Sequence, residues 1–196
     1  MRFRETTLQG VWLIEPEPQA DERGYFARAW CARELKDRGL ADRFVQSSVS
    51  FNRRRGTLRG IHYQAAPHEE AKLVRCTQGV VFDVVVDLRA GSPTRGKWYA
   101  AELSAANGRT LYIPEGCGHG FETLSDDAEL LYHMSVEYVP EAARGVRWDD
   151  ATLAISWPLP DPILSERDRA LPCFMRCATA AAPATVSQPR HLGARR

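Results

Sequence analysis

What this 196-residue chain lacks already excludes several classes of protein. Its five cysteines include no C-x-x-C pair, which argues against a zinc ribbon or a thioredoxin-type site. The odd count fits reduced thiols in a cytoplasm better than a secreted disulfide framework. The first ten residues, MRFRETTLQG, lack the apolar run of a signal peptide, and no stretch approaches the ~20 apolar residues of a membrane span. We therefore expect a cytoplasmic protein with no membrane partner.

The chain also lacks an excess of charge of either sign. Its 26 basic and 25 acidic side chains leave a net charge of +1, so no field extends over the whole molecule to attract nucleic acid. Three arginines at 53–55 resemble a nucleic-acid patch, but arginines before a turn glycine are typical of a solvated loop. We expect no nucleic-acid partner, and any bound anion must be held by a few local Lys or Arg side chains.

Helical patterns are scarce, whereas short strand patterns recur about every ten residues and predict a β-sandwich or barrel. The segment Leu73–Leu88 has two β-rich runs around Gln78-Gly79, which is a hairpin signal. In its second run Phe82, Val84 and Val86 form an apolar face, and the other face carries carboxylates. The other predicted strands are Val11–Glu15, Tyr25–Trp30, Val45–Phe51, Thr57–Gln64, Lys97–Leu103, Arg109–Ile113, Gly118–Leu124 and Glu129–Val136.

Only two short helices are predicted. One covers Ala32–Gly39 and ends on a glycine, as a C-terminal cap would. The other begins near Ser165, where Ser165-x-x-Asp168 is a capping signature. Residues 1–174 are predicted to form one domain. Residues 175–196, poor in large apolar side chains and punctuated by proline, are predicted to be a disordered tail.

The few histidines lie in informative places. From Gly108 to His119 the chain fits G-x5-P-x-G-x2-H, a pattern of cupin barrels, and Gly56 to His62 fits the G-x5-H of the companion motif. Gln64 stands where a metal-binding cupin has its second histidine. Two histidines and a carboxylate could still hold iron, but the lost ligand favours a pocket without metal or other cofactor.

A longer series of motifs makes the resemblance specific. The sequence resembles the dTDP-4-dehydrorhamnose 3,5-epimerase family, a group of jelly-roll cupins that act on nucleotide-linked 4-keto-6-deoxy sugars. The resemblance implies an all-β, double-stranded β-helix (jelly-roll) barrel with a few short helices, a homodimer and no metal. The matching stretches are DERGYF (21–26), GTLRGIHYQ (56–64), AKLVRCTQGVVFDVVVDLRAGSPTRGKW (71–98), LYIPEGCGHGF (111–121), ELLYHMSVEY (129–138), RGVRWDD (144–150) and LSERD (164–168).

The family's reaction explains the residue types. Epimerisation beside a ketone removes a C–H proton, stabilises an enolate and returns a proton to the other face, which requires a base that titrates near neutrality. By resemblance His62 is this base, Asp168 orients it, Tyr132 is the opposing acid and Lys72 stabilises the enolate oxygen. The residues implied in binding the nucleotide sugar are Arg23, Gln46, Ser48, Arg59 and His119, of which Arg23, Arg59 and His119 hold the diphosphate.

One of these assignments conflicts with simple strand geometry. Arg59 and His62 are three residues apart, so in a regular strand their side chains would point to opposite faces. Both can reach one pocket only if the strand is locally irregular, and Gly60 is where a bulge could form. We therefore expect a β-bulge at Gly60.

Departures from the family pattern concern the substrate more than the chemistry. Gln46-Ser47-Ser48 stands where relatives often have Gln-Asp-Asn, and Arg28 and Ala143 replace common glutamates. A CDP- or GDP-linked sugar, or epimerisation at one carbon, therefore remains an alternative to the dTDP 3,5-reaction. A silent sugar-nucleotide-binding cupin and a metal-dependent oxygenase are further rivals. A mere binder needs no acid–base pair, and Gln64 weakens the oxygenase reading.

Overall fold

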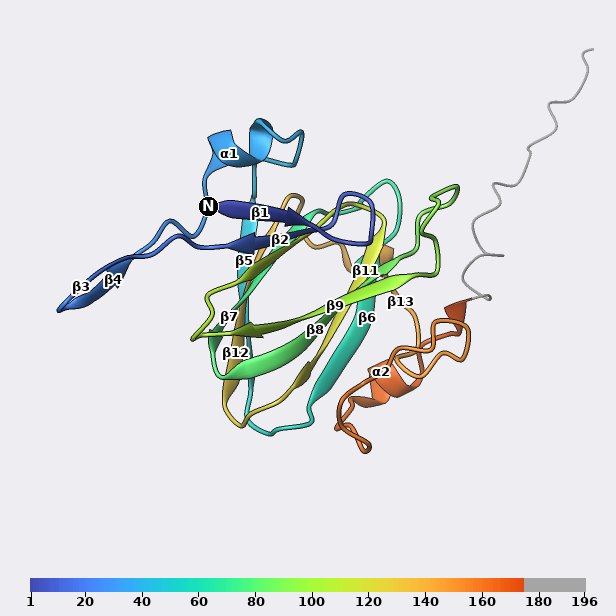
Figure 1. The fold of residues 1–196 in the computed structure, drawn as a ribbon. Coiled ribbons are helices and arrows are strands. Elements are labelled where there is room, and N and C mark those ends of the chain that lie inside the picture. Colours follow the sequence, from blue (N-terminus) through green and yellow to red (C-terminus); the bar gives the residue numbers. More distant parts are fainter. Residues whose placement is uncertain (175–196) are drawn as a thin grey trace, which may run out of the picture.

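Two antiparallel sheets form the body of the protein in the computed structural model, which describes residues 1–174 (Figure 1). The larger sheet has the order β1 (Arg2–Glu5), β2 (Trp12–Glu15), β10 (Thr110–Ile113), β7 (Lys72–Gln78), β12 (Ala128–Met134) and β5 (Gln46–Asn52). The smaller sheet has the order β13 (Ala143–Gly145), β6 (Leu58–Gln64), β11 (Cys117–Thr123), β8 (Val80–Asp87) and β9 (Trp98–Ser104). The predicted all-β jelly-roll barrel is confirmed.

The sheets bury three separate apolar layers. The layer between them contains Val74 of β7 and Val85 of β8, both fully buried. The outer face of the smaller sheet is covered by the segment from Val146 to Phe174, and the outer face of the larger sheet by helix α1 (Ala32–Lys36) and residues 40–44. Both sheets are therefore buried on two faces over part of their area, which explains their long apolar strands.

Strand β8 shows how the sequence directs these layers. Phe82, Val84 and Val86 point outward and pack beneath the chain's last segment. Asp83 and Asp87, on the alternate face, point into the barrel and are fully buried. The apolar face recognised in the sequence is thus the outer one, and the carboxylates occupy the interior, where each must be paired.

The predicted hairpin at Gln78-Gly79 is wrong. β7 pairs with β10 and β12 in the larger sheet, whereas β8 pairs with β9 and β11 in the smaller sheet. Gly79 has φ +74°, and a Cβ there would lie 2.4 Å from the Ser125 hydroxyl, so this turn is a tight corner that takes the chain from one sheet to the other. Val74 and Val85 can then face each other across the core.

The two helices are close to their predicted positions. α1 ends at Lys36, and Gly39, with φ +68°, completes the C-terminal turn while Leu40 N donates to Leu35 O. α2 covers Glu166–Arg169, and a 3-10 turn covers Pro140–Ala142. The predicted tail, 175–196, lies outside the described residues. In the described part of the chain, no helix is long and apolar enough to span a membrane.

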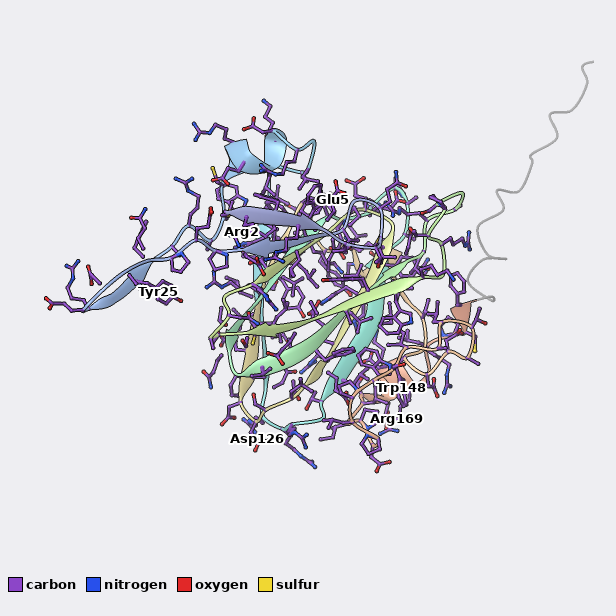
Figure 2. All side chains as sticks on the ribbon, in the orientation of Figure 1. Arg2, Glu5, Tyr25, Asp126, Trp148 and Arg169 are labelled. Carbon is purple, nitrogen blue, oxygen red and sulfur yellow. The ribbon has the colours of Figure 1, made fainter. Side chains whose placement is uncertain are left out.

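A short two-stranded arm extends away from the barrel (Figures 1 and 2). It consists of β3 (Gln19–Asp21) and β4 (Gly24–Phe26), and its side chains Tyr25 and Phe26 are 60% and 78% exposed. The strand predicted over Tyr25–Trp30 is therefore too long, because β4 pairs only with the three residues of β3. Such apolar exposure is unusual for a surface that faces only water.

Candidate active site

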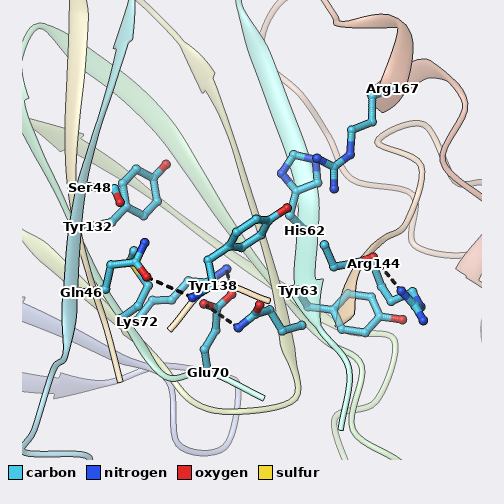
Figure 3. Close-up of a pocket in the computed structure, with 13 residues that line it drawn as sticks. Gln46, Ser48, His62, Tyr63, Glu70, Lys72, Tyr132, Tyr138, Arg144 and Arg167 are labelled. Carbon is cyan, nitrogen blue, oxygen red and sulfur yellow. Dashed lines mark hydrogen bonds and ion pairs between the residues drawn. The ribbon is translucent and has the colours of Figure 1, made fainter. Parts of the chain in front are cut away.

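A cavity of about 370 Å³ opens between the two sheets, on the side where β5 and β6 face each other (Figure 3). Its volume is within the usual range for small-molecule sites. Five of the nine predicted site residues line it: His62, Lys72, Tyr132, Gln46 and Ser48. Its other lining residues are Tyr63, Gln64, Glu70, Met134, Tyr138, Ala143, Arg144 and Arg167.

His62 is held by a carboxylate behind it. Its Nε2 lies 2.6 Å from Asp168 Oδ1, and the His62 side chain is 37% exposed while that of Asp168 is 6% exposed. Burial acts to raise the pKa of Asp168, but the hydrogen bond and charge of His62, with the bond to Ser165, keep that pKa below its usual value. An ionised carboxylate thus fixes the orientation of the imidazole ring.

Helix α2 places this carboxylate. Ser165 Oγ accepts a hydrogen bond from Asp168 N, which is the predicted N-cap. The capping and orienting interpretations of Ser165-x-x-Asp168 are therefore compatible, because the Asp168 backbone is used for one and its side chain for the other.

Tyr132 approaches the cavity from the opposite sheet. It shares the inner face of β12 with Leu130, and its ring meets that of His119 edge-on at a centroid distance of 5.7 Å. Burial, with a smaller effect of Asp83, raises the pKa of the Tyr132 hydroxyl well above its usual value. The hydroxyl therefore remains protonated near neutral pH and can donate a proton or a hydrogen bond.

The expected irregularity at Gly60 is present. In β11 one residue separates His119 from Phe121, but their partners His62 and Arg59 on β6 are separated by two, so β6 contains the extra residue. Gly60 has φ +122°, and a Cβ there would lie 2.5 Å from Gly120 Cα. The bulge places Arg59 and His62 on the same, inner face of β6.

Arg59 itself is not among the residues that line the cavity. Its side chain is exposed, and its Nε donates to Asn52 Oδ1 at 2.7 Å. Asn52 continues the inner face of β5, which also carries Gln46 and Ser48. A polar stripe on β5 therefore leads from the cavity toward the Arg59 guanidinium.

His119 and Arg23 occupy different surroundings. His119 is 5% exposed, and its Nε2 lies 2.9 and 3.0 Å from the two carboxylate oxygens of Asp83. Burial raises the pKa of Asp83, and His119 partly offsets this. Arg23 is at the tip of the arm, paired with Asp21, and does not line the cavity of its own chain.

Sequence reasoning missed five polar side chains that line the cavity: Tyr63, Glu70, Tyr138, Arg144 and Arg167. Tyr138, 50% exposed, lies in the loop after β12, and its backbone N–H donates to Gln46 Oε1 (Figure 3). The loops that carry Glu70 and Tyr138 have no periodic pattern that predicts which way a side chain points. Arg144 lies in β13 and Arg167 in α2, and both are inside motifs that carry the resemblance.

Gln64, which stands where a metal-binding cupin has its second histidine, anchors the neighbouring loops by hydrogen bonds. It is 2% exposed, accepts from Val139 N at 2.6 Å and donates to His68 O and Glu137 O. Within residues 1–174, no group of three or more His, Cys, Asp or Glu side chains is arranged to hold a metal ion.

Comparison with known proteins agrees with this architecture. The family model described as dTDP-4-dehydrorhamnose 3,5-epimerase matches residues 5–176. The dTDP-4-dehydrorhamnose 3,5-epimerase of Sinorhizobium fredii is 43% identical over 88% of this chain and 89% of its own length. The dTDP-4-dehydrorhamnose 3-epimerase of Streptomyces niveus is 44% identical over 86% of this chain and 82% of its own.

A solved structure shows the same likeness. The dTDP-6-deoxy-D-glucose-3,5-epimerase of Legionella pneumophila, in complex with dTDP-4-keto-L-rhamnose, superimposes with a TM-score of 0.86 at 37% identity. The match covers 95% of this chain and 99% of that one. The fold is of the cupin type, and the relatives identify the protein as an enzyme of the isomerase class. The chain belongs to the dTDP-4-dehydrorhamnose 3,5-epimerase family.

Proposed function

We propose that the protein inverts C3 and C5 of dTDP-4-dehydro-6-deoxyglucose to give dTDP-4-dehydrorhamnose. The observation that carries this proposal is the pair formed by His62, held by Asp168, and Tyr132, which approach one cavity from opposite sheets. A base and an acid on two sides of a sugar ring are what inversion, rather than simple exchange, requires. The names of the relatives support the same substrate.

The residues act in sequence at each carbon. His62 Nδ1, the ring nitrogen that does not contact Asp168, accepts the C–H proton, and the electrons of that bond move onto the C4 oxygen as an enolate. The Lys72 ammonium stabilises this oxygen. Tyr132 then gives its hydroxyl proton to the opposite face of the carbon, and proton exchange with solvent restores both groups.

The diphosphate lies, in this proposal, at the Arg59 end of the barrel. Arg59 and His119 belong to the subunit that supplies His62, and Gln46 and Ser48 on β5 line the path between the two ends. Guanidinium groups bind phosphate oxygens by paired, charge-assisted hydrogen bonds.

Arg23 requires a second subunit. Its arm extends away from its own barrel and exposes Tyr25 and Phe26, so we propose a homodimer in which each arm reaches the site of the partner subunit. Apolar exposure of this size on a projecting arm supports a contact with another chain.

Two observations concern the number of carbons inverted and the identity of the nucleotide. The Streptomyces niveus relative is named as a 3-epimerase, so single-site epimerisation is the second candidate. Arg28, which replaces a glutamate common in the family, is ion-paired with Glu34 at 2.6 Å beside the arm. This pairing neutralises the reversed charge locally, which supports retention of the dTDP nucleotide.

The proposal is tested by presenting dTDP-, CDP- and GDP-4-keto-6-deoxyglucose side by side to the wild type and to His62→Asn. We expect turnover of the dTDP sugar, and a loss of kcat on the order of 10²–10⁴ in the variant with dTDP binding retained. Turnover of only the CDP or GDP sugar, or a variant within a few fold of wild type, would contradict the proposal.

A further inference from the structure

The ammonium group of Lys72 has a carboxylate partner inside the cavity. Lys72 Nζ lies 2.9 Å from Glu70 Oε1, and each side chain is 10% exposed (Figure 3). Both residues line the cavity. Glu70 has no place in the mechanism above, so its position in an otherwise functional pocket calls for an explanation.

The local backbone forces the two side chains together. Ala71, between them, is 1% exposed in the outer apolar layer, and its N–H donates to Ser135 Oγ. Residues i and i+2 of an extended chain point to one side. Burial of Ala71 on the outer face therefore turns both Glu70 and Lys72 inward.

The loop that carries Glu70 is itself anchored. The Gln64 amide nitrogen donates to His68 O at 3.1 Å and lies 3.5 Å from Glu70 Oε2. Because the second distance is long for a hydrogen bond, the main contribution of Gln64 is to fix the loop rather than the carboxylate. The Lys72 ion pair is then the principal interaction of the Glu70 side chain.

A second carboxylate, Asp83, is near enough for Lys72 to lower its pKa, but both Asp83 oxygens already contact His119. Glu70 is therefore the carboxylate that fixes Lys72. A lysine has a flexible four-carbon stem, and a partly buried ammonium without a partner is unfavourable. An enolate-stabilising group is effective only when it is held in place before the charge develops.

We propose that Glu70 is a positioning residue that holds the Lys72 ammonium toward the substrate's ketone oxygen. The inference rests on the proposed function and deepens it. Glu70 does not contact the reacting atoms. It acts through Lys72, so its effect on the chemical step must disappear when Lys72 is absent.

The test compares Glu70→Gln with Glu69→Gln, which removes the neighbouring carboxylate and leaves the ion pair intact. We expect Glu70→Gln to lower kcat for the dTDP sugar about tenfold with KM within about twofold, and Glu69→Gln to match wild type. The decisive arm is a double-mutant cycle, in which Glu70→Gln added to Lys72→Met should lower kcat no further.

The outcomes separate the two proposals. If the wild type is active and Glu70→Gln behaves like Glu69→Gln, the role of Glu70 is wrong while the proposed function stands. An equal loss from Glu70→Gln with or without Lys72 would show a merely structural effect and would also overturn it. A wild type that does not turn over the sugar nucleotide would overturn the proposed function and this inference with it.

Discussion

At the scale of single residues, the site contains polar side chains that are each held by one partner. Asp168 holds His62, Asp83 holds His119, and Asn52 holds Arg59. Side chains fixed in this way need little reorganisation when substrate binds or when charge develops. Such a residue can be tested by substituting it and, as a control, a residue of the same type that lacks a partner.

Arg59 provides the first such test. Arg59→Ala should raise KM for the nucleotide sugar by at least about tenfold, because a charge-assisted contact with the diphosphate is lost. Arg54→Ala is the control, since its side chain lies in the exposed loop before β6. Steady-state kinetics measure KM for both variants. An equal rise in KM at both positions would assign anion binding to the basic loop as a whole.

At the scale of elements, the bulge in β6 matters most for function. It rotates Arg59 onto the face of His62, and it needs a residue without a side chain because β6 and β11 approach closely at Gly60 and Gly120. The same close approach fixes the register of β6 against β11, and therefore the position of His62 beside His119.

Gly60→Ala should accordingly destabilise the protein by about 2–4 kcal/mol and lower kcat/KM in the fraction that folds. Gly91→Ala is a matched control, since Gly91 also has a positive φ, +79°, but no atom within 4 Å of the added Cβ. It should cost about 1 kcal/mol. Urea denaturation measures both, and equal losses would mean that backbone strain, not the close approach, explains the glycine.

The bulge could be predicted from the sequence because Arg59 and His62 both had to reach one pocket and Gly60 lies between them. The turn at Gly79 could not, because a glycine turn looks alike whether it joins paired strands or takes the chain to another sheet. β12 and β11, which pair with β7 and β8, are distant in sequence and are chosen by core packing. Glu70 and Tyr138 were missed for a related reason, since loop direction depends on distant anchors such as Gln64 and Gln46.

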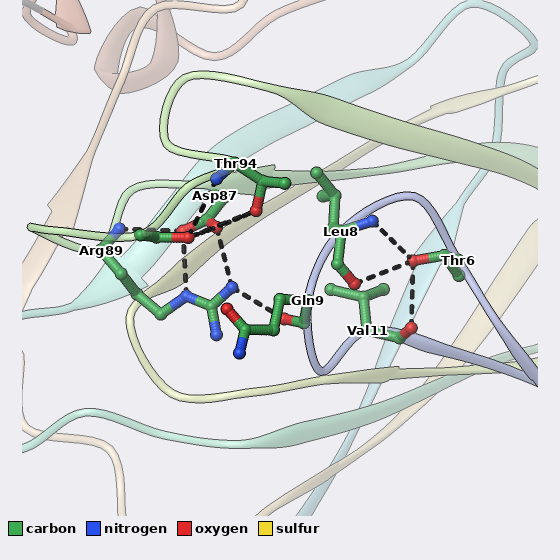
Figure 4. A network of polar contacts seen from close by, with 8 residues as sticks. Thr6, Leu8, Gln9, Val11, Asp87, Arg89 and Thr94 are labelled. Atoms are coloured by element: carbon green, nitrogen blue, oxygen red, sulfur yellow. Dashed lines mark hydrogen bonds and ion pairs between the residues drawn. The ribbon is translucent and has the colours of Figure 1, made fainter.

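A second element-scale feature is the polar network at the end of β8 (Figure 4). Both oxygens of buried Asp87 accept hydrogen bonds from Arg89, and Ser92 and Thr94 also donate to it. Arg89 Nη2 in turn donates to Gln9 O at 2.7 Å, which joins the β8–β9 loop to the β1–β2 loop. Burial acts to raise the pKa of Asp87, but these bonds lower it far below its usual value.

Because the pKa of Asp87 is lower in the folded than in the unfolded protein, its carboxylate stabilises the fold above about pH 4, and this contribution is lost as the pH falls. Asp87→Asn should cost about 2–3 kcal/mol at pH 7, and the difference from wild type should narrow by about 1 kcal/mol at pH 3. Urea denaturation at both pH values measures this. A difference independent of pH would show that Asp87 acts through packing alone.

At the scale of the whole molecule, the described residues 1–174 divide into a barrel with three buried apolar layers and an arm with none. The barrel contains the proposed acid–base groups, while Arg23, which is proposed to bind the diphosphate, lies on the arm. A complete site therefore requires the arm of one subunit to reach the barrel of another, as proposed above.

Subunit mixing tests this arrangement. Arg23→Ala and His62→Asn should each be defective alone, but a refolded equimolar mixture should regain about a quarter of wild-type activity, because each mixed dimer then contains one intact site. Mixing His62→Asn with itself is the control. If the mixture shows only the summed residual activities, each arm serves its own barrel or Arg23 does not bind substrate.

The central claim, that His62 and Tyr132 act on opposite faces at two carbons, is tested most directly by turnover in deuterated water. NMR of the product should show deuterium at both C3 and C5 with the wild type. Tyr132→Phe should still exchange protons through His62 but yield much less inverted product. Deuterium confined to one carbon with the wild type would contradict the 3,5 assignment, and full inversion by Tyr132→Phe would contradict the role of Tyr132.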